Sequence, residues 1–456
     1  MKIYLIRLNL RFSDILVISF LRFILASLLL IITFGCSFDT KTGIWKNINE
    51  QKSANIKLIK LSDSKEKIQT ELNSQSIISF NSKIKSNNAW SMSGLNSMNF
   101  TGHLQFRGQI NDFSKFKFKK IQYNKIKENP LIVGKNYFIT IDEKGSILKY
   151  VKGKLQWKKN IYEKKRERKK IKNISLGVSG KKIYGADNLG NYYAINMNDG
   201  EIVWLKKHRG TFNSQIKFFK DKLFLIDNDN VIWCFSAADG NEVWSFKTKS
   251  TFIKSKKRLS LVLTMDSVIF SNSAGDITKL DINTGQAIWI MPTQNTLVQY
   301  EANFLETSDI VLLNKNLFFS NNFSKIYSIN TDTGILNWIQ NINSTIRPVI
   351  IDRNLFTISN EGYLIAINSE TGKIIRSKYI LDKLDEKKRE KTLIHGFLIA
   401  SNKVYITTNL GYLIVCSVDT GNVENMIKIS KSELSEPIIS DNRLHILTNN
   451  AVVVFN

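Results

Sequence analysis

The chain has 456 residues, 43% of them hydrophobic and 11% aromatic, and its 65 Lys and Arg against 39 Asp and Glu give a net charge of +26. This much apolar material can bury a large core, which excludes a chain that is disordered as a whole. Three widely spaced cysteines, Cys36, Cys234 and Cys416, exclude a disulfide-stapled scaffold and form no zinc-binding pattern.

Residues 1–35 have the pattern of a lipoprotein signal peptide. Four basic residues precede the apolar stretch FILASLLLIITF at 23–34, which ends before Gly35 and Cys36. This stretch is shorter than the roughly 20 residues of a membrane span, and a small residue follows it, as in a secretory signal. The residues around Cys36 resemble the bacterial lipobox, which implies lipidation of Cys36. An uncleaved signal anchor is the alternative.

Residues 36–85 are rich in Lys, Ser, Asn and Gln and show no sustained hydrophobic period. This composition predicts a lipidated N-terminus followed by a flexible linker. The folded body is therefore expected to begin near residue 86 and to occupy residues 86–456.

An internal repeat occupies this body. The segment from Asp187 to Trp204 recurs three times with two glycines ten residues apart, and two further copies have Asn230 and Ser324 in place of the first glycine. Apolar runs between the turn residues indicate short strands joined by hairpins. The second glycine of the unit is found at Gly200, Gly240, Gly285, Gly334, Gly372 and Gly421.

Five of the seven visible copies carry a tryptophan four residues after the second glycine: Trp157, Trp204, Trp244, Trp289 and Trp338. A large ring at one fixed place in each unit can pack one unit on the next. Arg376 and Asn425 stand there in the other two copies, which predicts weaker packing at those units.

The second glycines are 38 to 49 residues apart, which is the length of four short strands with their turns. The 367 residues from Trp90 to the C-terminus then accommodate eight units of about this length. We expect an all-β fold, a single eight-bladed β-propeller of four-stranded antiparallel blades. Its eighth blade would join His445–Leu447 and Ala451–Phe455 to N-terminal strands near Leu104–Phe106 and Phe116–Ile121.

The repeats DINTGQAIW and NTDTGILNW resemble those of pyrroloquinoline quinone (PQQ) dehydrogenase-like propellers. Quinoprotein dehydrogenases and the outer-membrane protein assembly factor BamB share this repeat. The segment Trp90–Leu104 (WSMSGLNSMNFTGHL) is similar to one that precedes the first blade in the BamB family. That resemblance implies a non-enzymatic, lipid-anchored scaffold at the periplasmic face of the outer membrane. It would act as a monomer within the β-barrel assembly machinery and dock on the periplasmic domains of BamA.

By position, the resemblance places partner contacts in loops between central blades, with Lys254, Lys256, Arg258, Glu301 and Glu306 as candidates. Two alternatives stay open, a PQQ-dependent dehydrogenase and a general periplasmic protein-binding propeller. Dehydrogenases of this kind resemble one another in a bound Ca²⁺ and adjacent cysteines, whereas the cysteines and the four histidines here are scattered. We therefore expect no cofactor, no metal and no catalytic residues.

Basic runs occur at Lys164–Lys170, Lys254–Arg258 and Lys387–Arg389, each between repeats. Nucleic-acid binding would require such runs on one face, and export argues against that partner, so none is expected. Solvated loops, anionic lipid or lipopolysaccharide headgroups and an acidic partner protein remain as explanations of the charge.

Overall fold

The computed structural model of the chain describes residues 36–38, 45–47, 70–118, 130–293 and 305–456. The chain divides into two units, Met1–Ser64 and Lys65–Asn456. In the first unit, β1 (Cys36–Phe38) pairs antiparallel with β2 (Trp45–Asn47), a short element that the sequence did not predict. The expected leader at 1–35 lies outside the described residues.

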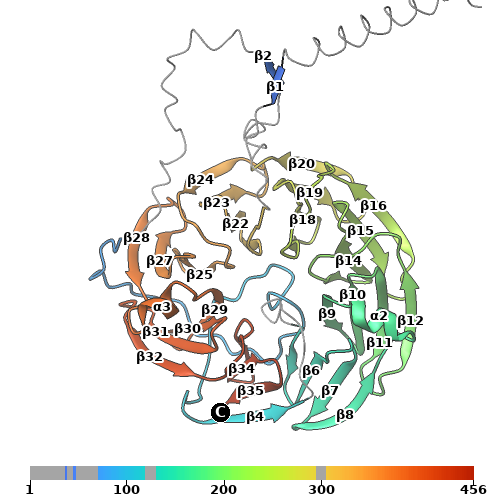
Figure 1. Cartoon of the computed structure of the whole chain (residues 1–456), viewed down its shortest axis with the longest axis horizontal. Helices are drawn as coiled ribbons and strands as arrows, with labels where there is room; N and C mark the ends of the chain where they lie inside the picture. The colour runs from blue at the N-terminus through green and yellow to red at the C-terminus, as the bar shows by residue number, and fades with distance from the viewer. Residues whose placement is uncertain (1–35, 39–44, 48–69, 119–129, 294–304) are drawn as a thin grey trace, which may run out of the picture. The chain divides into compact units, whose positions relative to one another are not determined.

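In the described part of the chain, the second unit is a ring of eight sheets, each built on four antiparallel strands (Figure 1). The predicted all-β, eight-bladed propeller is therefore confirmed. Each blade runs outward from its first strand, near the ring axis, to its fourth strand at the rim, and successive blades follow one another along the chain.

The first four blades contain the following strands: β5 (Ile132–Gly134), β6 (Tyr137–Ile141), β7 (Ile147–Val151) and β8 (Lys154–Lys159); β9 (Ile174–Ser179), β10 (Lys182–Asp187), β11 (Asn191–Asn196) and β12 (Ile202–Lys207); β13 (Lys217–Phe219), β14 (Lys222–Ile226), β15 (Val231–Ser236) and β16 (Glu242–Lys247); β17 (Leu261–Leu263), β18 (Ser267–Ser271), β19 (Ile277–Asp281) and β20 (Ala287–Met291).

The next three blades contain these strands: β21 (Val311–Leu313), β22 (Asn316–Asn321), β23 (Lys325–Asn330) and β24 (Leu336–Gln340); β25 (Val349–Ile351), β26 (Asn354–Ile358), β27 (Tyr363–Asn368) and β28 (Ile374–Tyr379); β29 (Ile394–Ala400), β30 (Lys403–Thr408), β31 (Tyr412–Ser417) and β32 (Val423–Lys428). Two short helices, α2 (Lys165–Lys170) and α3 (Glu386–Arg389), lie in loops between blades. None of the helices among the described residues has the length and apolarity needed to cross a membrane.

The repeated turn residues adopt the left-handed backbone that the sequence pattern requires. Gly275 and Gly285, for example, have φ of +86° and +71°, a region that is strained for residues with a Cβ atom. Asn230 and Ser324, which replace the first glycine in two copies, have φ of +62° and +58°. Asparagine tolerates this region better than serine, but both copies keep the same turn.

The ring closes with strands from both ends of the chain. Strands β33 (Ile438–Ser440), β34 (Arg443–Leu447) and β35 (Ala451–Phe455) are completed by β4 (Phe113–Lys117), with Phe455 opposite Phe113 (Figure 1). The prediction is correct for β4 and wrong for Leu104. Strand β3 (His103–Leu104) instead pairs in parallel with β29 and extends the preceding blade to five strands. Three C-terminal strands, β33 to β35, already belong to the closing blade, so only one N-terminal strand is needed to complete it.

Residues 70–85, which the sequence assigns to the linker, contact the propeller. Leu72 exchanges two backbone hydrogen bonds with Ser377 of β28, with N–O distances of 3.1 and 2.9 Å. Ile78 is buried in the core between blades β25–β28 and β29–β32. Burial of this side chain explains why the folded unit extends N-terminal to the expected boundary at residue 86.

Candidate functional site

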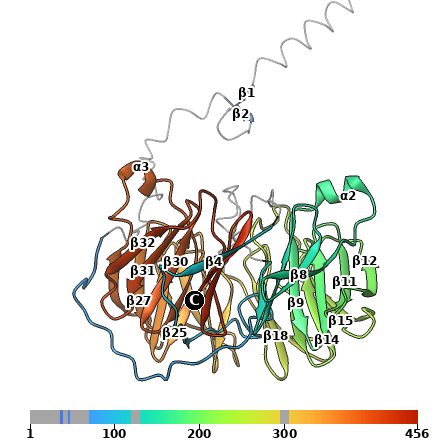
Figure 2. The same cartoon turned by 90° about the horizontal axis from the view of Figure 1, so that it is seen from below.

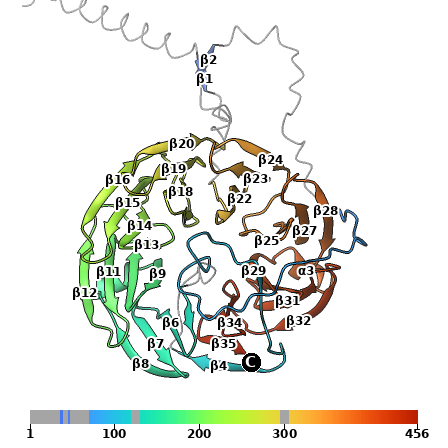
Figure 3. The ribbon, with the colours of Figure 1, turned by 180° about the vertical axis from the view of Figure 1, so that it is seen from behind.

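The two faces of the ring differ. In every blade the fourth strand leads to the first strand of the next blade at the same end, so all of these loops, with α2 and α3, share one face. Figure 2 shows both helices on that side. We call it the inter-blade face. Across the opposite face runs the segment Trp90–Leu104, which we call the plug segment (Figure 3).

The plug segment is held by the ends of the innermost strands. The backbone of Trp90 pairs with Val133 of β5, and further on Ser97 and Met98 accept hydrogen bonds from Leu263 of β17 and Leu312 of β21. Gly94 has φ of +74°, and a Cβ atom there would lie 1.9 Å from Asn99 Oδ1. The glycine is therefore required for the segment to fold tightly across the ring.

Inside the ring, Lys217 of β13 is completely buried against this segment. Its Nζ donates hydrogen bonds to Ser93 O (2.7 Å), Asn96 O (2.6 Å) and Asn99 Oδ1 (2.7 Å). Burial lowers the pKa of Lys217 well below its usual value. Three oxygen acceptors thus fix the plug segment to the inner wall of the ring. Lys217 is not among the residues predicted from the sequence, although its place within the apolar run IKFF is a usable signal.

A cluster of charged side chains lies just before the innermost strands β17, β21, β25 and β33 of four other blades and surrounds a cavity of about 60 Å³. Arg258 forms an ion pair with Asp309 at 3.2 Å, and both side chains are buried. Arg347 is bonded to Glu436 in the same way and also lies 5.8 Å from the ring of Trp90. This cluster therefore ties several blades together near the axis.

Burial and charge compete at the two carboxylates of this cluster. Burial, the largest single effect, raises the pKa of Asp309, but the positive charges of Arg258, Lys257, Arg347 and Lys217 together outweigh it, so the pKa lies below its usual value. For Glu436 burial is the larger effect, and its pKa is raised in spite of Arg347. Each carboxylate has an arginine beside it, which is the arrangement that a structural ion-pair network needs.

The structure places the candidate partner residues differently from one another. Lys256 is exposed, and Lys254 forms an ion pair with Asp229 at 3.2 Å on the inter-blade face. Arg258, on the same loop, instead points into the charged cluster, with 11% of its side chain exposed. The backbone of Glu306 pairs with Asn322 before β21. Glu301 lies outside the described residues.

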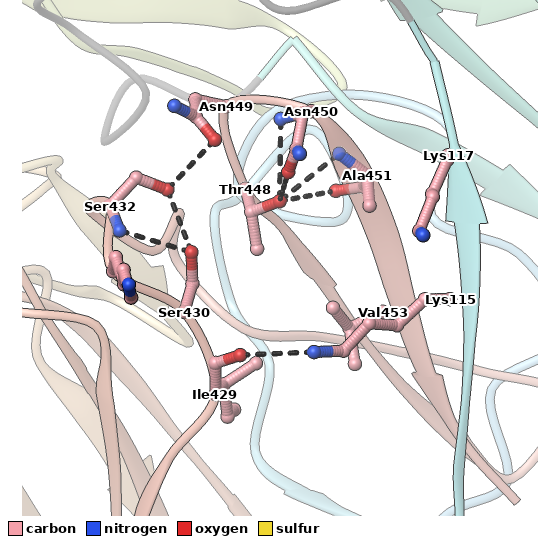
Figure 4. Close-up of a pocket in the computed structure, with 11 residues that line it drawn as sticks. Lys115, Lys117, Ile429, Ser430, Ser432, Thr448, Asn449, Asn450, Ala451 and Val453 are labelled. Atoms are coloured by element: carbon pink, nitrogen blue, oxygen red, sulfur yellow. Dashed lines mark hydrogen bonds between the residues drawn. The ribbon is translucent and has the colours of Figure 1, made fainter.

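A second cavity, of about 620 Å³, lies between β32 and the closing blade (Figure 4). Its lining includes Lys115, Lys117 and Lys431, together with Ser432 and Thr448, and none of its lining residues is acidic. Lys115 Nζ donates to Ile429 O at 3.1 Å, and Ser432 Oγ donates to Asn449 Oδ1 at 3.0 Å. This groove is chemically suited to an anionic group.

The tryptophans of the repeat lie between blades. The ring of Trp244 covers Gly285 of the following blade so closely that a Cβ atom there would lie 2.6 Å from it, and Trp244 Nε1 donates to Ile282 O. A β-bulge beside each tryptophan shifts the register between the third and fourth strands of its blade. The same contact joins Trp157 to Gly200, Trp204 to Gly240, Trp289 to Gly334 and Trp338 to Gly372.

Arg376 takes the place of tryptophan at the next junction and corrects the prediction of weaker packing there. Its guanidinium lies over Gly421 and donates to Val418 O at 2.9 Å, the carbonyl that corresponds to Ile282 O. It also bonds to Asp419 O and, at 2.9 Å, to Ser76 O. Burial lowers its pKa to about 10, so it stays charged at neutral pH. Asn425, in contrast, is exposed.

The remaining candidates for chemistry are dispersed. Cys234 and Cys416 are buried, and burial raises the pKa of each thiol to about 12. His445 is buried in β34, whereas His395 Nδ1 donates a hydrogen bond to Leu434 O at 2.8 Å. Among the described residues, no group of three or more His, Cys, Asp or Glu side chains is placed to hold a metal ion.

Comparison with known families now decides the family. Residues 143–378, more than half of the chain, match the family model described as outer membrane protein assembly factor BamB. The chain belongs to the BamB family. No curated protein sequence matches it.

Solved structures share the fold of this BamB-family chain. The crystal structure of BamB from Moraxella catarrhalis superposes with a TM-score of 0.61 at 15% identity, over 75% of this chain and 100% of the other. A europium-containing methanol dehydrogenase gives a TM-score of 0.62 at 11% identity, over 80% and 91%. The quinohemoprotein alcohol dehydrogenase from Comamonas testosteroni gives 0.60 at 9%, over 81% and 80%. These likenesses concern the fold, which scaffolds and enzymes share.

Proposed function

We propose that this chain is a non-enzymatic, lipid-anchored scaffold of the outer-membrane β-barrel assembly machinery, which docks on BamA at the periplasmic face of the outer membrane. The match of residues 143–378 to the BamB family is the observation that carries this proposal. The size of the cavity near the axis supports it, since about 60 Å³ is far below the several hundred Å³ of a typical cofactor pocket.

Docking would use exposed loops of the inter-blade face, with Lys254, Lys256 and Glu306 as the candidate contacts. The test is size-exclusion chromatography of the mature protein with the periplasmic domains of BamA. We expect co-elution at micromolar concentration. Lys254→Glu with Lys256→Glu should weaken it, whereas the matched pair Lys135→Glu with Lys181→Glu, in turns of the opposite face, should not. Failure of the unaltered protein to co-elute would refute the proposal.

Lipidation is proposed at Cys36, which the structure places at the start of β1. Cells labelled with radioactive palmitate should incorporate label into the protein, and Cys36→Ala should abolish it. Ser37→Ala is the matched control and should label normally. Undiminished labelling of the Cys36 variant would show that this cysteine carries no lipid.

A PQQ-dependent dehydrogenase is the second candidate, because two dehydrogenases have the same propeller fold. It predicts dye reduction with an alcohol or a sugar after addition of PQQ and Ca²⁺. A flat baseline under these conditions would remove this candidate and leave the scaffold proposal untouched.

A further inference from the structure

The basic runs that are separate in the sequence share one face of the ring. They lie in the loops 160–173, 248–260 and 380–393, which join β8 to β9, β16 to β17 and β28 to β29. We call the face formed by these three loops the basic face; Figure 2 shows two of them, with α2 and α3, projecting on the same side. The runs lie in separate inter-blade loops, as expected, but the topology of the ring gathers these loops on one face although they are far apart in the chain.

The lysines and arginines of the first loop point outward. No residue of α2 is buried, and the side chains of Lys164, Lys165, Arg166, Lys169, Lys170 and Lys172 are exposed. Arg168 differs, since its Nε donates to Tyr162 O at 2.8 Å and so holds the loop in shape. In α3, Arg389 has the same role, with its Nε bonded to Leu384 O at 2.6 Å. Each loop thus has a structural arginine. The outward charges of the first loop are mostly positive, whereas in the α3 loop Asp382, Asp385, Glu386 and Glu390 offset most of the basic residues, and Lys388 pairs with Asp385 at 2.6 Å.

Large apolar side chains stand exposed beside these charges. Phe252, between Lys249 and Lys254, is 102% exposed, and Leu393, two residues after Lys391, is 57% exposed. A solvated loop gains nothing from a fully exposed phenylalanine, whereas an aromatic ring flanked by lysines is typical of segments that enter the headgroup region of a bilayer.

The chain that leads to the N-terminus reaches the folded unit at the same face. Glu71 lies next to the end of β28 that continues into the α3 loop: its Oε1 accepts a hydrogen bond from Tyr379 N at 3.1 Å, and its carboxylate lies 3.9 Å from Lys378 Nζ. From there the chain runs antiparallel to β28, away from the basic face, through Leu72. The first described residues of this unit therefore lie at the basic face, where a tether from a lipid anchor would join it.

We infer that the basic face binds the surface of a bilayer that contains anionic phospholipid, with Phe252 and Leu393 entering the headgroup region. The inference deepens the proposed function, because it uses the lipid anchor as the source of the tether. Three charged loops at separate positions around a ring can touch a planar surface together. A small acidic patch on a protein partner would need only one of them. The lysine-lined groove beside β4 lies at the rim of the same face and adds to its positive charge.

Vesicle co-sedimentation of the unit Lys65–Asn456, which closes its own ring, tests this without the anchor. We expect binding to phosphatidylcholine vesicles that contain phosphatidylglycerol, no binding to phosphatidylcholine alone, and loss of binding at high salt. The triple variant Lys165→Glu, Arg166→Glu and Lys169→Glu should bind about 100-fold more weakly. The matched control Lys135→Glu, Lys181→Glu and Lys373→Glu carries the same charge change in turns of the opposite face and should bind normally.

Insertion is tested with an environment-sensitive dye at Phe252→Cys. The dye should react at this position alone, because Cys234 and Cys416 are fully buried with the pKa of each thiol raised to about 12. Anionic vesicles should raise and blue-shift its emission, whereas a dye at Lys181→Cys should not respond.

Equal binding to both vesicle types, or equal loss in the opposite-face control, would overturn the inference. The α2 triple variant keeps Lys254, Lys256 and Glu306, so it should still co-elute with BamA domains. Loss of vesicle binding with co-elution intact therefore separates membrane contact from partner docking, and absence of co-elution with vesicle binding intact would refute only the proposed function.

Discussion

Two parts of the ring solve the same packing problem with different chemistry. From β5 to β24, each blade lays a tryptophan on a glycine of the next blade, and the indole N–H donates to one carbonyl. Around the closure, Arg376 and Phe116 cover Gly421 and Gly153 instead. The first part depends on apolar area and shape, and the second adds buried ionisable groups. The stability of the closing region should therefore respond to pH and to the N-terminal chain, whereas that of the tryptophan junctions should not.

N-terminal residues contact the blades that lack a tryptophan at the junction. Arg376 bonds to Ser76 O, β3 extends the blade β29–β32, and β4 completes the closing blade. A tryptophan has one N–H donor, while a guanidinium has five, so only arginine can fill the junction and also hold a passing segment. Arg376, which stands where five other blades have tryptophan, thus links the segment around Ser76 to the propeller.

The largest expected effect is at the tryptophan junctions. Trp338 is 9% exposed, and its Nε1 donates to Ser369 O at 2.9 Å. Trp338→Ala should lower the free energy of unfolding by about 3–5 kcal/mol, as is usual for removal of a buried aromatic side chain. Urea denaturation followed by circular dichroism measures this. Asn425→Ala, at the exposed equivalent position, should stay within about 0.5 kcal/mol of the parent protein.

The second effect concerns pH in the closing blade. Burial lowers the pKa of His445 from the usual 6.5 to about 4. Between these values the unfolded chain binds a proton that the folded chain does not, so stability falls as the pH decreases from about 6.5 to 4. The loss should approach about 3 kcal/mol.

The variant His445→Asn should remove this part of the pH dependence, as measured by urea denaturation at several pH values. An unchanged slope in the His445 variant would contradict the assignment.

The sequence allowed the fold to be predicted because the repeat is local. Turn glycines, strand length and tryptophan position recur within each unit, and their period sets the number of blades. What the sequence did not reveal depends on contacts between distant segments. The partner of β3, the burial of Ile78 and the role of Arg376 all require residues about 300 positions apart to meet.

The candidate site also depends on contacts that arise only when the ring closes. The three basic runs look dispersed in a linear chain, and only closure of the ring places them on one face. Arg258 and Lys254 are neighbours in sequence, yet one lies in a buried ion pair and the other at the surface. Composition alone cannot distinguish them, because the difference arises from the direction of each side chain.

A third prediction separates backbone strain from the ring contact. At Gly285 a Cβ atom would meet the Trp244 ring at 2.6 Å, whereas at Gly421 it would meet Arg376 Nε at 3.1 Å. Both glycines have positive φ, so both alanine variants carry a strain of about 1–2 kcal/mol. Gly285→Ala should cost roughly 1–2 kcal/mol more than Gly421→Ala, because the ring must move. Equal losses in urea denaturation would show that strain alone decides.

The smallest change in stability is expected for Arg376→Trp. This variant tests whether a tryptophan can take the place of the arginine and fill this junction as it does the five tryptophan junctions. The indole N–H can donate to Val418 O as its counterparts do, so the free energy of unfolding should stay within about 1 kcal/mol of the parent. Ser76 O and Asp419 O lose their guanidinium donor, so the segment that holds Leu72 and Ile78 should open more often. Hydrogen–deuterium exchange should become faster for residues 70–80 and stay unchanged in β31. Unchanged exchange at 70–80 would mean that burial of Ile78 alone holds this segment on the propeller. Arg376 would then stabilise only the contact between the two blades.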